Sequence, residues 1–397
     1  MDQSVNDLHV LPSSDALSGL RIDVVITGSI ASVESVRFIR ALRRLGADVT
    51  PWLSHGGSTF ITPMAVTWAA GKEAITGFSG SASHIATSNA VVIAPASSSI
   101  LAKIARGMTD SHCTALVASA LGQSKPVMIL PAMHDSLKAA PAMQEHLAKI
   151  SSWANVSILS AREEEGKQKF PEPEHLADQV AHIMNRPLRP KLPVLVTMGT
   201  TRGYIDDVRY ISNYSSGKLG SLISEELYRK GYETTVVAGP SEHKPRLATS
   251  MRPVLTTTEM LHECEDASAK GLSGAVFCAS VLDYEPAEKS LGKLKSGHDN
   301  LTVSFKPTPK IIEKIDLAIQ PKIGFKLEIG LSQEEAYAIA KSYIEKYKLT
   351  ALLVNELSSV SDKKHKAIAF VKNQPPQTLT SKNEIAAFIA AHIAKSH

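Results

Sequence analysis

The residues best suited to chemistry lie in the second half of the chain, where Asn213 precedes the run Ser215–Lys218. Two hydroxyls, a glycine and a lysine at the start of a helical pattern form an anion cradle, because backbone N–H groups and the helix dipole favour negative charge there. The Asn213 amide could bind a carbonyl or a transferred acyl group. The spacing is not that of a P-loop. A polar helix cap, with Ser215 or Ser216 as the N-cap, is a compatible alternative.

Two polar turns in the first half could also bind an anion. Gly28, Ser29 and Ser32 follow a β-branched run and open a helical pattern, and residues 94–99 (APASSS) follow a second run. Polar turns at the carboxyl ends of parallel strands define a crevice at a topological switch point. Because the three-glycine dinucleotide fingerprint is absent, this combination favours a mononucleotide. A plain strand–helix turn is the alternative for the first of them.

Apolar β-branched runs alternate with helical stretches along almost the whole chain. This pattern predicts an α/β fold whose parallel sheets are covered on both faces. It occurs twice, on either side of residues 185–193 (NRPLRPKLP), whose three prolines indicate a linker rather than a surface loop. We therefore expect two doubly wound domains, at residues 19–184 and 194–397, behind an N-terminal tail of residues 1–18.

Composition and charge exclude several classes of function. The 397 residues are 43% hydrophobic and 21% charged, with a net charge of +4 and dispersed Lys and Arg, which argues against a nucleic-acid surface. The apolar runs are too short to span a bilayer and the N-terminus has no signal-peptide pattern, so no membrane partner is expected. Three cysteines without paired spacing indicate neither a disulfide framework nor a zinc site. We expect a cytoplasmic protein that acts on small molecules.

The first half resembles the flavin-dependent cysteine decarboxylase family over about residues 20–185. The stretches SHIATSNAVVIAPASSSILAKIARGMTD and PAMHDSLKAAPAMQEHL carry the likeness. It implies a flavodoxin-like domain that binds FMN, with His84 as the catalytic residue beside the flavin. His134 stands where the family usually has an asparagine that binds the substrate carboxylate, and a histidine there could still contact it. The expected FMN contacts are Gly28, Ser29, Ser32, Ala96, Ser97 and Ser99.

Other positions depart from this family. Members that make phosphopantetheine have a cysteine that protonates an enethiol intermediate, shortly before a Gly-Arg-Met segment. The matching residues 159–176 (LSAREEEGKQKFPEPEHL) contain no cysteine, and Lys167 stands in place of the arginine. Ser99 also replaces a residue that is commonly asparagine. The resemblance therefore implies FMN binding and leaves open whether the decarboxylation is completed.

The second half is close to the phosphopantothenoylcysteine synthetase family over about residues 190–390. The run VRYISNYSSGK carries the match, and AGPSEHKP, ASVLDYEP, GKLKSG, IGFKLE and LVNEL follow in order. The resemblance implies a Rossmann-like ligase domain in which the carboxylate of 4′-phosphopantothenate attacks the α-phosphorus of CTP or ATP. The amine of cysteine then attacks the resulting acyl-nucleotide. Mg²⁺ is expected with the nucleotide, and its protein ligands are unknown.

The same resemblance implies roles for individual residues. Asn213 holds the acyl intermediate and Lys293 contacts the nucleotide phosphates, with Lys295 as the fallback because Ser296 departs from the double lysine usual there. A solvated surface loop is the alternative for both lysines. The remaining nucleotide contacts are Ser215, Ser216, Gly217, Lys218 and Ala279, with Asp283 at the ribose or metal-linked groups, Phe325 at the base and Lys326 near the phosphates.

In their order, the two halves resemble the bacterial bifunctional enzyme of coenzyme A synthesis. The resemblance also implies a homo-oligomer. Three alternatives stay open: a ligase whose flavin domain is degenerate, a nucleotide-binding flavoprotein that catalyses nothing, and a decarboxylase that acts on cysteine at peptide C-termini, which would leave the second half of the chain unexplained.

Overall fold

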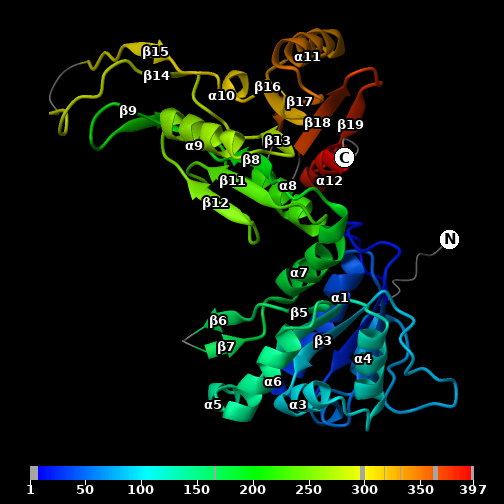
Figure 1. Cartoon of the computed structure of the whole chain (residues 1–397). Coiled ribbons are helices and arrows are strands. Elements are labelled where there is room, and N and C mark those ends of the chain that lie inside the picture. The colour runs from blue at the N-terminus through cyan, green and yellow to red at the C-terminus, as the bar shows by residue number, and fades with distance from the viewer. Residues whose placement is uncertain are drawn as a thin grey trace. The chain divides into compact units, whose positions relative to one another are not determined.

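The structure is a computed structural model, and it describes residues 8–164, 167–295, 300–316, 318–330, 332–360 and 365–394. The chain divides into two compact units, Met1–Pro187 and Leu188–His397 (Figure 1). Each is described separately below. Among the described residues, no helix combines the length and the apolar character needed to cross a membrane.

The first unit contains a parallel sheet of five strands in the order β2-β1-β3-β4-β5. Its strands are β1 (Arg21–Ile26), β2 (Asp48–Leu53), β3 (Ala90–Ala96), β4 (Val127–Pro131) and β5 (Val156–Ile158), beside a small antiparallel hairpin of β6 (Arg162–Glu164) and β7 (Lys167–Lys169). Its helices are α1 (Ser35–Arg44), α2 (Pro63–Ala70), α3 (Ser98–Arg106), α4 (His112–Gly122), α5 (Asp135–Lys138), α6 (Pro141–Ser151) and α7 (Pro173–Asn185), with 3-10 turns at Ile30–Glu34, Gly57–Thr59 and Arg186–Leu188. The order is that of a flavodoxin-like sheet, whose switch point lies between β1 and β3.

Two apolar layers cover this sheet because strand side chains alternate between its faces. Val24 on β1 and Val92 on β3 pack with α1, α2 and α7, whereas Val25 and Ile93 pack with α3, α4 and α6. All four side chains are fully buried. The long apolar runs of the sequence therefore form strands with both faces covered.

The second unit has an eight-stranded sheet in the order β12-β11-β8-β13-β16-β17-β18-β19. The strands of this sheet are β8 (Val194–Met198), β11 (Thr234–Ala238), β12 (Ser250–Pro253), β13 (Gly274–Phe277), β16 (Lys322–Glu328), β17 (Ala351–Val360), β18 (His365–Val371) and β19 (Gln377–Leu379). The helices are α8 (Lys218–Arg229), α9 (Thr257–Ala269), α10 (Ile311–Lys314), α11 (Gln333–Tyr347) and α12 (Lys382–Ala394). Helices α8 and α12 cover one face, and α9, α10 and α11 cover the other.

The six parallel strands of this sheet follow the Rossmann order, with the switch point between β8 and β13. The predicted α/β fold with two doubly wound sheets is confirmed. The second sheet is mixed, because β18 and β19 add an antiparallel edge that the sequence analysis did not foresee.

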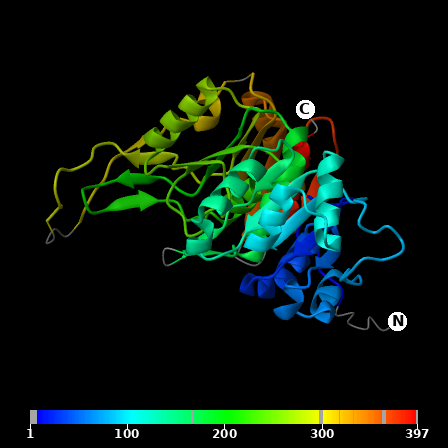
Figure 2. The same ribbon diagram turned by 60° about the horizontal axis from the view of Figure 1, so that its bottom comes forward.

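Two hairpins extend from the carboxyl side of the second sheet. One pairs β9 (Arg202–Tyr204) with β10 (Tyr210–Ser212), and the other pairs β14 (Tyr284–Pro286) with β15 (Phe305–Pro307). They run side by side away from the sheet (Figures 1 and 2). The residues between β14 and β15 include both lysines of the GKLKSG segment.

Candidate active sites

In the first unit, Thr27 joins the two polar turns predicted to bind an anion. Its hydroxyl donates to the carbonyl oxygen of Pro95 at 2.7 Å and accepts the N–H of Ser97 at 2.8 Å. The buried Ser32 hydroxyl donates to the Thr27 carbonyl oxygen at 2.7 Å, so Ser32 supports the turn from within. The sequence analysis did not identify Thr27, because its hydrogen-bond partners lie about 70 residues away along the chain and no local pattern indicates these contacts.

The first turn also lies against the turn that follows β2. A Cβ atom on Gly28 would come within 3.3 Å of the Gly56 backbone, and the N–H of Ser54 donates to the Ile26 carbonyl oxygen at 3.0 Å. Glycine at position 28 therefore allows a close approach of two backbones. The Ser54–Gly57 turn is a second feature of this crevice that the sequence analysis missed.

Helix α3 begins at the second polar turn and has no side-chain cap. Its N-cap residue is Ser97, whose hydroxyl makes no capping hydrogen bond, whereas hydroxyl side chains cap α2, α4, α9 and α11. The first N–H groups of a helix have no partner within it, so those of α3 can receive an anion. Ser97 is partly exposed and Ser99 exposed, while Ala96 is fully buried at the end of β3. The residues fit the phosphate group of a mononucleotide.

His84 lies in the loop before β3, half-buried in a cluster of rings. The Phe78 ring packs edge-on against His84 and against His112, with centroids 5.9 Å and 6.3 Å apart. The Nδ1 atom of His84 is buried and has no hydrogen-bond partner among the described residues. Burial lowers the pKa of His112, whose Nε2–H donates to the carbonyl oxygen of Leu53 at 3.1 Å. The Nδ1 atom of His84 is thus a buried polar atom whose hydrogen-bonding capacity is unused within the described residues.

His134 is exposed at the start of α5 and acts as its N-cap. Its Nδ1 accepts the N–H of Ser136 at 3.2 Å and lies 2.8 Å from the Ser136 hydroxyl oxygen. An Nδ1 that accepts a hydrogen bond leaves the proton of the neutral ring on Nε2. The ring can therefore donate a hydrogen bond to a carboxylate, as the amide of asparagine would. Lys167 begins β7, and its side chain lies outside the described part of the structure.

In the second unit, Asn213 reaches across the switch point between β8 and β13. Its Nδ2 donates to the carbonyl oxygens of Val281 at 3.0 Å and Ser280 at 3.5 Å. The N–H of Ser280 donates to the carbonyl oxygen of Gly199, which follows β8. The exposed Asn213 side chain is thereby fixed at the carboxyl ends of the two strands, where open α/β sheets bind ligands.

The predicted cradle Ser215–Lys218 leads directly into α8. Gly217 is the N-cap residue with φ of 75°, and it makes no side-chain capping bond. A Cβ atom there would lie 2.6 Å from the Ser241 side chain, so the position requires glycine for both conformation and space. The main chain of Ser216 accepts the N–H of His243 at 3.0 Å. The AGPSEHKP loop therefore supports the cradle, whose helix N-terminus can receive a phosphate.

The other predicted nucleotide contacts are spread over the same edge of the sheet. The N–H of Ala279 donates to the Thr197 hydroxyl at 3.3 Å, and Asp283 is exposed and paired with Lys310. Lys310 is a cation that the sequence analysis did not single out. Lys293 and Lys295 are exposed in the segment after β14, and Ser296 lies outside the described residues.

Phe325 and Lys326 lie on opposite faces of β16. Phe325 packs with the core beneath α8 and α12, whereas Lys326 pairs with Glu328 at 3.2 Å and lies 5.6 Å from the Tyr343 ring on α11. Strand alternation forces this separation, so the two side chains cannot face one ligand from the same side of the sheet.

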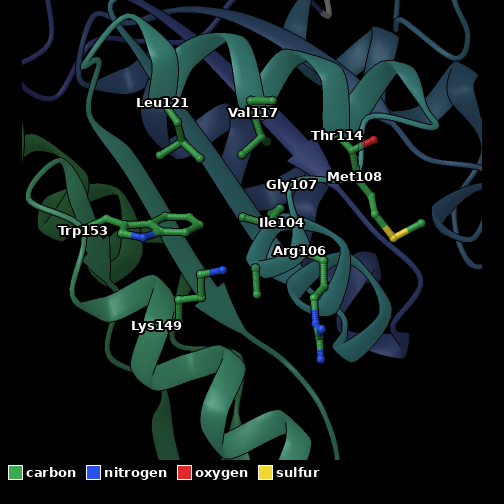
Figure 3. Close-up of a pocket in the computed structure, with 11 residues that line it drawn as sticks. Ile104, Arg106, Gly107, Met108, Thr114, Val117, Leu121, Lys149 and Trp153 are labelled. Carbon is green, nitrogen blue, oxygen red and sulfur yellow. The ribbon is translucent and has the colours of Figure 1, made fainter.

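A cavity of about 320 Å³ lies elsewhere in the first unit (Figure 3). Ile104, Val117, Leu121 and Trp153 form much of its apolar lining, and Lys149 adds a charge. It is at the C-terminal end of α3, away from Ser97, and none of the predicted site residues lines it. Its position separates it from the polar turns.

Comparisons with known proteins place both units in described families. The family model "DNA/pantothenate metabolism flavoprotein C-terminal domain" matches residues 191–396, and the model "Flavoprotein" matches residues 10–185. The coenzyme A biosynthesis bifunctional protein CoaBC of Thermococcus kodakarensis is 34% identical over 92% of this chain and 93% of that protein. The protein of the same name from Methanocaldococcus jannaschii is 30% identical over 96% of this chain and 95% of that protein.

Solved structures are also similar to parts of the chain. The DNA/pantothenate metabolism flavoprotein from Streptococcus pneumoniae is 28% identical, and the match covers 52% of this chain and 100% of that chain with a TM-score of 0.48.

Proposed function

We propose two consecutive reactions for this chain, which belongs to the CoaBC family of coenzyme A biosynthesis bifunctional proteins. The second unit joins cysteine to 4′-phosphopantothenate at the expense of a nucleoside triphosphate. The first unit then removes the cysteine carboxylate to give 4′-phosphopantetheine. A cytoplasmic location and a homo-oligomeric state belong to the same proposal.

The observation that carries the ligase assignment is the position of Asn213 beside the start of α8, where the hydroxyls of Ser215 and Ser216 lie at the first N–H groups. Its amide, fixed on Val281 at 3.0 Å, lies four residues before the N-cap residue Gly217. The pantothenate carboxylate attacks the α-phosphorus, and pyrophosphate leaves. The amine of cysteine then attacks the acyl carbon, and the nucleoside monophosphate leaves. In this proposal Asn213 holds the acyl group in both steps, and the cradle stabilises phosphate charge.

The nucleotide has further proposed contacts around the switch point. CTP is the expected nucleotide and ATP the alternative. Asp283 binds the ribose or metal-linked groups, Phe325 packs at the base, and Lys293 and Lys295 neutralise phosphate charge. Mg²⁺ would enter with the phosphates of the nucleotide, because this ion is commonly bound through substrate phosphates and few protein ligands. Lys326, which lies on the other face of β16 beside Glu328, is proposed to lie near the phosphates.

FMN would be held by the two turns that Thr27 joins. Gly28, Ser29 and the start of α3 would surround its phosphate. The flavin would supply oxidation of the cysteine thiol, after which the carboxylate leaves as carbon dioxide, and then reduction of the resulting enethiol to phosphopantetheine. His84 is proposed as the catalytic residue beside the flavin, where its imidazole would transfer a proton. His134 orients the substrate carboxylate through Nε2–H. The fixed ring of His134 supports this role.

The absence of a suitable thiol supports a second candidate, a ligase whose flavin unit does not complete decarboxylation. The chain has three cysteines, and Cys113 alone lies in the first unit. Burial raises the pKa of the Cys113 thiol to about 12, so it cannot readily serve as an acid or nucleophile.

Product analysis separates the two candidates. The full chain, loaded with FMN, is incubated with phosphopantothenate, cysteine, Mg²⁺ and either CTP or ATP, and the products are identified by mass spectrometry. The bifunctional proposal predicts phosphopantetheine, with faster turnover on CTP. Phosphopantothenoylcysteine as the sole product would support the ligase-only candidate, and an enethiol product would indicate oxidation without reduction.

A further inference from the structure

The turn between β9 and β10 carries a fully buried carboxylate, Asp206. Its Oδ1 accepts the N–H groups of Val208 at 2.8 Å and Arg209 at 2.6 Å, which closes the hairpin turn. Aspartate commonly bonds the backbone two residues ahead in this way. These two bonds account for one carboxylate oxygen and leave the other for a different partner.

The second oxygen of Asp206 holds a residue 88 positions away. Its Oδ2 accepts the N–H of Leu294 at 3.1 Å and a guanidinium N–H of Arg209 at 3.1 Å. Arg209 in turn donates to the carbonyl oxygen of Leu294 at 3.2 Å. Asp206 and Arg209 therefore fix both backbone polar groups of Leu294.

Asp207 holds the residue on the other side of Lys293. Its Oδ2 accepts the N–H of Gly292 at 2.8 Å, and its own N–H donates to the Gly292 carbonyl oxygen at 3.2 Å. Its Oδ1 pairs with Lys289 at 2.7 Å. Lys293 is thus the single residue between two whose backbones are both tied to the β9–β10 turn.

We infer that Asp206 is a positioning residue for the ligase reaction, which holds the segment Gly292–Leu294 so that Lys293 is aimed at the nucleotide phosphates. The inference rests on the proposed ligase function for the role of Lys293, whereas the tether itself rests on the hydrogen bonds above. The side chain of Lys293 is exposed. The position of this residue is therefore set by the backbone hydrogen bonds of its two neighbours, Gly292 and Leu294. A catalytic cation needs such restriction, since preorganised charge acts without reorganisation during the reaction.

Asp206→Asn tests the inference sharply. Asparagine is isosteric and keeps an acceptor for the Val208 and Arg209 N–H groups, but its NH₂ group cannot accept the Leu294 N–H. Asp316→Asn is the matched control, because Asp316 also accepts a backbone N–H in a loop, from Ala318 at 2.9 Å, away from this segment.

The first readout is amide hydrogen exchange of the peptide covering Ser290–Lys295 in the full-length protein, which needs no enzymatic activity. We expect exchange at least tenfold faster in Asp206→Asn and unchanged exchange in Asp316→Asn. Equal protection in Asp206→Asn and wild type would overturn the tether.

The second readout is a double-mutant cycle on kcat for pyrophosphate release with Lys293→Ala. We expect Asp206→Asn to lower kcat about tenfold, and the double variant to be no slower than Lys293→Ala alone. Independent, multiplying losses would overturn a role through Lys293. Absence of substrate-dependent pyrophosphate release in the wild type would instead contradict the ligase proposal, and the exchange result would still decide whether the tether exists.

Discussion

The amide of Asn213 donates to the carbonyl oxygen of Val281 at 3.0 Å, which joins the segment after β10 to the segment after β13 at the switch point of the second sheet. The two residues are 68 positions apart in the sequence. Their contact places the exposed Asn213 side chain beside the start of α8, whose N-cap residue is Gly217. The consequences for both units can be tested residue by residue.

Replacing Asn213 with alanine should abolish most ligase turnover without unfolding the protein. We expect kcat to fall about 100-fold, the order of magnitude lost when a polar group that contacts the reacting group is removed. KM for the nucleotide should change much less, because the cradle is untouched. Steady-state pyrophosphate release measures both constants. Asn383→Ala, at an exposed asparagine on α12, should leave them unchanged, and a similar loss there would contradict a specific role for Asn213.

Replacing Thr27 with valine should weaken flavin binding. The substitution preserves the shape of the side chain but removes the bonds to Pro95 and Ser97, so the two turns lose their link. We expect the Kd for FMN, measured by flavin fluorescence, to rise about tenfold or more, with a stability cost of about 1–3 kcal/mol. Thr114→Val removes another buried hydroxyl of the same unit at α4. Equal losses of FMN affinity in both variants would point to general destabilisation.

Substitutions at His134 should separate its capping role from its binding role. Alanine removes both the N-cap of α5 and the proposed carboxylate donor, so we expect decarboxylation to slow about tenfold or more. Asparagine can cap the helix and donate through its amide, so His134→Asn should keep most of the activity. The rate of carbon dioxide release from phosphopantothenoylcysteine measures the effect. Full activity in His134→Ala would remove this residue from the site.

The stability of the second unit should depend on pH through Glu225. Burial alone would raise the pKa of this carboxyl, but hydrogen bonds and charge from Arg246, with the charge of Arg229, more than offset it and hold the pKa below its ordinary value. A depressed pKa in the folded state gives stability that is present above the unfolded-state pKa, about 4.3, and is lost as pH falls through the folded-state pKa.

Glu225→Gln should therefore lower the free energy of unfolding by about 1–3 kcal/mol at pH 7. The difference from wild type should begin to shrink as the pH falls below the unfolded-state pKa of about 4.3, and it should be smallest below the folded-state pKa, where the wild-type carboxyl is protonated in both states. Urea unfolding at several pH values measures it. Glu334→Gln, at an exposed glutamate on α11, serves as the control and should stay within about 0.5 kcal/mol of wild type. A difference for Glu225→Gln that is independent of pH would contradict this account.

Local sequence patterns predicted the structural features that depend only on neighbouring residues, such as strand–turn–helix units. The polar turns around Gly28 and Gly217 were identifiable because strand, turn and helix follow one another within a few residues. The separation of Phe325 from Lys326 could also have been predicted, since adjacent residues of a strand face opposite sides. The family resemblance implies that both residues lie near one nucleotide, which they would approach from the two faces of the sheet.

Contacts between distant segments could not be read from the sequence. The sequence around Thr27 is that of an ordinary threonine at the end of a strand. Its hydrogen bonds to Pro95 and Ser97 depend on the folded structure and could not be predicted locally. The sequence around Asp206 indicates an ordinary turn residue. The hydrogen bond from the Leu294 N–H to its second carboxylate oxygen could not be predicted from neighbouring residues. The antiparallel edge formed by β18 and β19 likewise depends on pairing with β17, which no local periodicity specifies.

The central claim is that the second unit makes an acyl-nucleotide from phosphopantothenate and passes the acyl group to cysteine. The most direct measurement is pyrophosphate release by the purified full chain, with each substrate omitted in turn and phosphopantothenoylcysteine quantified in parallel. The account predicts sustained release only when phosphopantothenate, cysteine and a nucleoside triphosphate are all present, with one phosphopantothenoylcysteine formed per pyrophosphate. Sustained release without phosphopantothenate, or no release in the complete mixture, would contradict it.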